Sequence, residues 1–203
     1  MKTPFSQGSL DNFCALYAVI NALRSLHNLS SFQCRRILHE TLLRYSKDYD
    51  FFSGVVTGSM DYEHVVHEML SHYCAELFPV RAYLPFKKAP ASEDALWDAV
   101  ARWLTGVSRR AVLLRFMRFT PQQDAAVIRH WTVAERLLGD SMFLYDSSRE
   151  PTALHSLMRH QVTSFRENVT EERFVWVLPQ SCIFLEGADM PAKGGFVINH
   201  YDL

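Results

Sequence analysis

The sequence predicts an α+β fold, in which a helical first part packs on an antiparallel β-sheet formed by the later part. Through much of the first half, apolar residues recur at three- and four-residue spacing, which is typical of helices with one buried face. The second half contains short runs of β-branched and aromatic residues between turn residues, which is typical of strands. Helices and strands segregated in this way favour an α+β plan. Because 203 residues can bury one sizeable core, we expect a single domain over residues 1–203.

The helical part is expected to begin just before Cys14, with Asp11 or Asn12 as the N-cap. Ser30-Ser31 precedes the next apolar pattern and is a good start for a second helix. The segment 46–59 contains glycine and aromatic residues, and we expect a loop there. We predict helices over residues 12–27, 30–45, 60–77 and 92–105.

The clearest strand signal is a hairpin over residues 130–146. Its two apolar runs are separated by Gly139-Asp140, a pair that suits a tight turn. Leu154–His160 is expected to form a short helix. The other predicted strands cover Val80–Leu84, Ala111–Phe119, 173–178 and 181–186.

Cys14 is the first candidate for chemistry. In the first turn of a helix, unpaired backbone N–H groups and the positive end of the helix dipole favour a thiolate. A thiolate is the nucleophilic form of sulfur and attacks carbonyl carbon. Gln7 lies close enough upstream to present its amide as a donor to a developing oxyanion. The alternative is that Cys14 is only a small core residue, since free cysteines are often buried.

A cysteine nucleophile needs a base, and the base needs a group that orients it. His130 opens the first strand of the predicted hairpin and Asp146 ends the second, so the hairpin brings the two side by side. Asp146 then accepts a hydrogen bond from one imidazole nitrogen, and the other nitrogen faces Cys14. His200 is the alternative base, but it lacks an obvious orienting partner.

The order of these residues resembles that of the papain-like cysteine peptidase superfamily, and within it the bacterial branch that includes the leader peptidases of bacteriocin exporters. The resemblance covers residues 7–23 and 111–148. It implies a papain-like fold, with the nucleophile at a helix N-terminus packed on an antiparallel sheet. It also implies the catalytic roles of oxyanion donor, nucleophile, base and orienting residue for Gln7, Cys14, His130 and Asp146, respectively.

The sequence departs from the family pattern at two places. Ala15 follows the cysteine where the family often has glycine, and Ser147-Ser148 follows Asp146 where the family often has proline. Neither change removes a catalytic group. The resemblance therefore implies a thiol hydrolase that cleaves a peptide or isopeptide bond in a protein or peptide substrate. The alternatives are a glutamine deamidase or acyltransferase acting as an effector or toxin, and a non-catalytic binding module on the same fold.

Composition argues against several other classes. The net charge is −1 and like charges form only short clusters, so we expect no nucleic-acid partner. No apolar stretch approaches the roughly 20 residues that span a bilayer, and the start lacks the pattern of a Sec-type signal peptide. We therefore expect a cytoplasmic protein, or an effector exported without a cleaved signal.

The cysteines argue against a metal site. Cys14, Cys34, Cys74 and Cys182 are widely spaced and form no C-x-x-C pair, so they match neither a zinc site nor a disulfide framework. His72 lies near Cys74, but no second pair accompanies it. We expect no metal and no cofactor.

Overall fold

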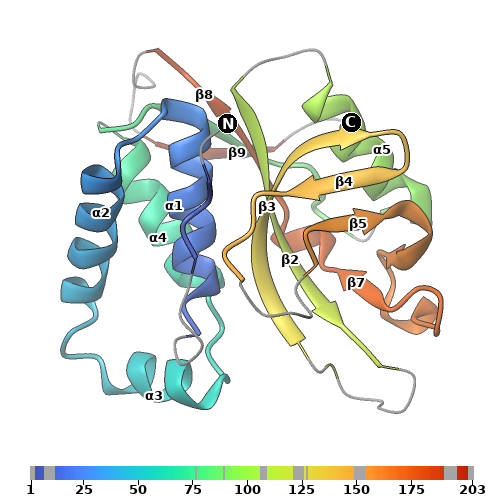
Figure 1. Cartoon of the computed structure of the whole chain (residues 1–203), viewed down its shortest axis with the longest axis horizontal. Coiled ribbons are helices and arrows are strands. Elements are labelled where there is room, and N and C mark those ends of the chain that lie inside the picture. The colour runs from blue at the N-terminus through green and yellow to red at the C-terminus, as the bar shows by residue number, and fades with distance from the viewer. Residues whose placement is uncertain are drawn as a thin grey trace.

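The described residues form five α-helices and one mixed sheet, which confirms the α+β class. In this computed structural model, α1 to α4 gather on one side and the sheet lies beside them (Figure 1). Among these residues no helix is both long and apolar enough to cross a membrane. The helices are α1 (Cys14–His27), α2 (Ser31–Arg44), α3 (Tyr49–Thr57), α4 (Glu63–Cys74) and α5 (Glu93–Leu104). The structure describes residues 3–6, 12–75, 77–88, 90–105, 109–120, 126, 128–148, 154–189 and 196–200.

All four predicted helices are present, but the cap expected for α1 is wrong. Phe13 occupies the N-cap position and has no polar side chain to bond the first turn. The Asn12 side chain instead donates to the Val55 carbonyl oxygen of α3, 2.8 Å away, and Asp11 lies outside the described residues. At α2 the Ser30 side chain caps the helix as predicted.

The loop expected over residues 46–59 is also wrong, because α3 lies within it. The Asp48 carboxylate accepts a hydrogen bond from the Phe51 N–H at 2.9 Å and caps the helix. Gly58, with φ of 69°, ends the helix in the left-handed conformation. Phe51 is buried. The glycine and aromatic residues that suggested a loop therefore supply a helix end and a buried face.

Nine strands form the sheet within the described residues. Their main order is β5-β4-β3-β2-β8-β1-β9, and β7 pairs with both β2 and β6. Of these pairings only β1–β9 and β6–β7 are parallel. The helix expected over Leu154–His160 is wrong, because part of it pairs with β4 as a strand. The strands are β1 (Val80–Leu84), β2 (Arg110–Arg118), β3 (Ile128–Leu138), β4 (Ser141–Leu144), β5 (Ser156–Met158), β6 (Val162–Thr163), β7 (Val175–Val177), β8 (Ile183–Gly187) and β9 (Ile198–His200).

The sheet separates two apolar cores. Along β2, Leu113 packs in the core shared with α1, α2 and α4, whereas Val112 and Leu114 pack in the core beneath α5. Side chains that alternate between the two faces of a strand produce this division. Helix α1 is the central element of the first core, since it contacts two other helices and strands β2, β3 and β8. This packing fixes the start of α1 against the sheet.

The predicted hairpin is present as β3 and β4, with its turn at Gly139-Asp140. Glu135 is an extra residue in β3, and this β-bulge shifts the pairing register by one position. Beyond the bulge, Leu144 pairs with Ala134 of β3, so the side chains of alternate residues from Ala134 back to His130 share one face. A one-residue shift exchanges the faces of a strand. The bulge therefore puts Asp146 on the face of β3 that carries His130.

Candidate active site

The structure brings three of the four predicted site residues together where the helices meet the sheet. Cys14 is the first residue of α1 and is 7% exposed. His130 lies near the start of β3, and Asp146 follows the end of β4. Helix α1 packs beside β3 (Figure 1). Gln7 lies outside the described residues.

His130 and Asp146 form a buried pair. The Nε2 atom of His130 lies 2.7 Å from Oδ1 of Asp146, and the two side chains are only 8% and 3% exposed. An ionised carboxylate can only accept, so Nε2 carries the proton of this bond. Nδ1 is then the ring nitrogen left for the thiol.

The chain that follows β4 holds the Asp146 carboxylate in place. The backbone N–H of Ser148 donates to Oδ2 at 3.2 Å, while His130 occupies Oδ1. Burial alone would raise the pKa of Asp146, but the hydrogen bonds from His130 and Ser148 lower it below its usual value. Asp146 is therefore ionised at neutral pH.

His130 also interacts with the Cys14 side chain, which lines the same cleft. Burial is the largest single influence on the pKa of His130 and lowers it, but the hydrogen bonds to Asp146 and Cys14 together raise that pKa to about 10. The imidazolium form therefore persists at neutral pH. The Phe116 ring packs edge-on against the imidazole, with ring centroids 5.5 Å apart. The histidine is thus held between a carboxylate, a thiol and an aromatic ring.

The first turn of α1 is open to an anionic group. Phe13 provides no side-chain cap, and no acidic residue lies in that turn. Backbone N–H groups at a helix start have no partner within the helix and stabilise negative charge. Within the described residues, the turn that begins at Cys14 can therefore donate to an oxygen bound beside the sulfur.

A cleft of about 460 Å³ opens next to Cys14 and His130. The segment between α3 and α4 forms one wall, and the Tyr62 hydroxyl ties this wall to the start of α1 by donating to the Asn12 carbonyl at 2.6 Å. The residues lining the cleft are Asn12, Cys14, Gly58, Met60, Tyr62, Arg115, Ala126, Ile128, Arg129, His130, Trp131 and Ser148.

The segment just before Gln7 is anchored on α1. The fully buried Asn21 side chain accepts a hydrogen bond from the Phe5 N–H at 2.9 Å and donates to the Phe5 carbonyl at 3.0 Å. The Arg24 guanidinium lies 4.3 Å above the Phe5 ring. The chain therefore runs along α1 two residues before Gln7.

The other candidates from the sequence lie elsewhere in the fold. Cys34, Cys74 and Cys182 are buried, and burial raises the pKa of Cys74 to about 12 and raises that of Cys182 as well. His200 lies exposed on β9, with three strands between β9 and β3. Among the residues that the structure describes, no group of three or more His, Cys, Asp or Glu side chains is arranged to hold a metal ion.

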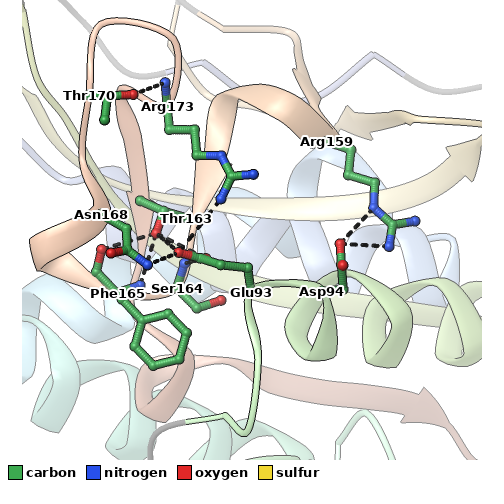
Figure 2. Close-up of polar contacts among 9 residues, drawn as sticks. All are labelled: Glu93, Asp94, Arg159, Thr163, Ser164, Phe165, Asn168, Thr170 and Arg173. Atoms are coloured by element: carbon green, nitrogen blue, oxygen red, sulfur yellow. Dashed lines mark hydrogen bonds and ion pairs between the residues drawn. The ribbon is translucent and has the colours of Figure 1, made fainter.

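A second cavity, of about 260 Å³, lies where α5 meets the β5–β7 segment and shares no lining residue with the cleft. Figure 2 shows that Glu93 accepts hydrogen bonds from Thr163, Ser164 and Asn168. Hydrogen bonds to Glu93, despite its partial burial, lower the pKa of this carboxyl. These contacts attach the segment to the start of α5, so we assign the cluster a structural role.

Sequence reasoning missed the far wall of the cleft and Ser148. Met60 and Tyr62 were expected inside a helix, but α4 starts only at Glu63, and the two residues line the cleft instead. Nothing local in the sequence marks them as part of a site. Ser148 did carry a signal, because a backbone N–H two residues after an aspartate commonly bonds its carboxylate.

No protein-family model, curated protein or solved structure matches this chain.

Proposed function

We propose that this protein is a papain-like thiol hydrolase that cleaves an amide bond in a protein or peptide substrate, with Cys14, His130 and Asp146 as its catalytic triad. The observation that carries the proposal is His130 itself. One ring nitrogen bonds a buried carboxylate, and the ring also interacts with the Cys14 side chain, which lines the same cleft. A core histidine and a core cysteine need no such arrangement, whereas a nucleophile with an oriented base requires it.

Acylation follows from this geometry. In the resting site His130 holds the proton taken from Cys14 as an imidazolium, and the thiolate sulfur forms a bond to the substrate carbonyl carbon. The carbonyl oxygen becomes an oxyanion, which the backbone N–H of Cys14 and the side chain of Gln7 stabilise. The C–N bond then breaks, and His130 returns the proton to the departing amine. A thioester on Cys14 remains.

Deacylation uses the same groups with water as the nucleophile. His130 takes a proton from water, the new C–O bond forms, and the C–S bond breaks to release a carboxylic acid and restore Cys14. Throughout both steps Asp146 keeps Nε2 protonated and stabilises the imidazolium without taking its proton. The hydrogen bond from Ser148 keeps that carboxylate oriented.

Mass spectrometry of a proteome-derived peptide mixture tests the proposal. The full chain is incubated with the peptides in H₂¹⁸O, beside a Cys14→Ala control. We expect new peptide termini carrying ¹⁸O only with the unchanged chain. Glutamine converted to glutamate without backbone cleavage would assign a deamidase, and amide exchange between peptides would assign an acyltransferase. No covalent change, together with an unreactive Cys14, would refute catalysis and favour a binding module.

A further inference from the structure

We propose that the cleft selects substrates that carry a carboxylate close to the scissile amide, an inference that rests on the hydrolase function proposed above. The described residues that line the cleft include Arg115 and Arg129 but no aspartate or glutamate. A substrate with an anionic group complements this lining and is attracted to it.

The two arginines are placed to act on one anion. Arg115 of β2 pairs with Trp131 of β3, and Arg129 precedes Trp131 by two residues, so all three side chains project from the same face of the sheet. Diagonal neighbours on an antiparallel pair are roughly 7–8 Å apart. Two long guanidinium side chains at that separation can converge on a single carboxylate, the anion for which their donor geometry is suited.

Arg115 is the anchored member of the pair. Its side chain is only 15% exposed, and Nη1 lies 3.1 Å from Oδ1 of Asp61 and 3.6 Å from Oε2 of Glu63. Asp61 is 69% exposed, so water screens its charge. These contacts orient the guanidinium at the wall of the cleft and leave part of its donor set for a substrate.

Arg129 is the member of the pair that has no counter-charge among the described residues. It is exposed, it immediately precedes His130 on β3, and no carboxylate pairs with it in the part of the chain that the structure describes. A substrate carboxylate can therefore bind Arg129 without displacing any carboxylate of the described residues. We assign to Arg129 the main contribution to acidic selectivity, with Arg115 as the second donor.

The carboxylate has two chemical sources in a polypeptide: the side chain of an aspartate or glutamate, and a free C-terminus. Both present the same two oxygens to the arginines, and they differ in where the substrate chain must end. Peptides with one α,β-unsaturated γ-amino acid in the backbone distinguish them, because this unit captures a nucleophilic thiol while residues continue on both sides. Each flanking position carries glutamate or glutamine, and each peptide is made with a free acid or an amide terminus.

The rate of Cys14 labelling, measured by intact mass and peptide mapping on the full chain, is the readout. We expect one position where glutamate is labelled about tenfold faster than glutamine, the lower range for a charge-assisted hydrogen bond. Arg129→Gln should remove this preference, and the rate of Cys14 labelling by iodoacetamide, measured in the same variant, corrects the peptide rates for any change in thiol reactivity. Arg36→Gln is the matched control, since Arg36 is an exposed α2 residue paired with Glu40 of the same helix, and it should keep the preference.

The outcomes separate the two proposals. A preference for the free acid over the amide, lost in Arg129→Gln, supports the same site and assigns its ligand as a chain terminus. Equal rates for all matched peptides, or a glutamate preference that survives Arg129→Gln, overturns the acidic subsite and leaves the nucleophile supported. Failure of every peptide to label Cys14 counts against the hydrolase, and this inference falls with it.

Discussion

Asp146→Asn removes the charge of the buried pair while keeping the size of the side chain. In the native protein the His130–Asp146 bond is 2.7 Å long, and both side chains are less than a tenth exposed. Removing one partner of a buried ion pair costs about 3–5 kcal/mol of unfolding free energy. Solvent screening reduces this value little, because neither group faces water. We therefore expect a loss of this size at mildly acidic pH.

The size of the loss depends on pH. The folded-state pKa of His130 is raised, so its contribution to stability is fully present below its unfolded pKa of about 6.5 and is lost as the pH rises through about 10. The folded-state pKa of Asp146 is lowered, so its contribution is present above the unfolded value and is lost only in strong acid. In Asp146→Asn, burial of His130 without a counter-charge favours neutral imidazole. The difference in unfolding free energy between the unchanged protein and Asp146→Asn should therefore be largest near pH 5–6 and become smaller toward pH 10.

Urea unfolding followed by tryptophan fluorescence at pH 5.5 and pH 9.5 measures this gap. Asp140→Asn is a matched control, because Asp140 lies in the exposed hairpin turn. A gap below about 1 kcal/mol at pH 5.5, the size of a surface pair, would show that the two groups are not a buried ion pair. A gap that is equal at both pH values would show that the imidazole is not protonated in the native state.

Three further predictions concern the thiol and the oxyanion. Iodoacetamide at neutral pH should modify Cys14 before the other three cysteines by peptide mapping, and His130→Ala should slow this while His200→Ala should not; the reverse would transfer the role of base to His200. Gln7→Ala should lower turnover of a cleaved peptide by about 10²–10³ and leave alkylation unchanged, because alkylation develops no oxyanion; slowed alkylation would contradict this role. Asn21→Ala leaves the Phe5 backbone groups without their partner, so it should lower the free energy of unfolding in urea by about 1–3 kcal/mol. It should also lower turnover, as Gln7→Ala does. Normal turnover in Asn21→Ala would show that the Phe5 anchor does not position Gln7.

Helices and hairpin were predictable because their signals are local. The four expected helices carry apolar residues on one face, and the capping pattern at the start of α2 is complete in the four residues from Ser30 to Gln33. The hairpin has a turn pair between two apolar runs. Signals of this kind depend on neighbours along the chain, so tertiary packing need not be known to read them.

The two wrong elements depend on partners distant in the sequence. Phe51 of α3 is buried and stacks on Phe13 at the start of α1, with ring centroids 6.3 Å apart, and this burial outweighs the glycine at Gly54. Ser156–Met158 has no clear strand pattern of its own, and it forms a strand because it pairs with β4. Cross-strand pairing decides the conformation of short apolar segments more than intrinsic preference does.

The position of Asp146 in the proposed triad also depends on a contact distant in the sequence. With the register set by the turn, where Leu138 pairs with Ser141, Asp146 would lie opposite Val133, whose side chain packs in the core with α1. The bulge at Glu135 moves the pairing by one position and turns Asp146 onto the face of His130. The Glu135 carboxylate accepts a hydrogen bond from Ser25 of α1 at 3.2 Å, so the extra residue is bound to the helix that carries Cys14. The spacing of His130 and Asp146 in sequence therefore indicates a pair only when a contact with α1 is also known.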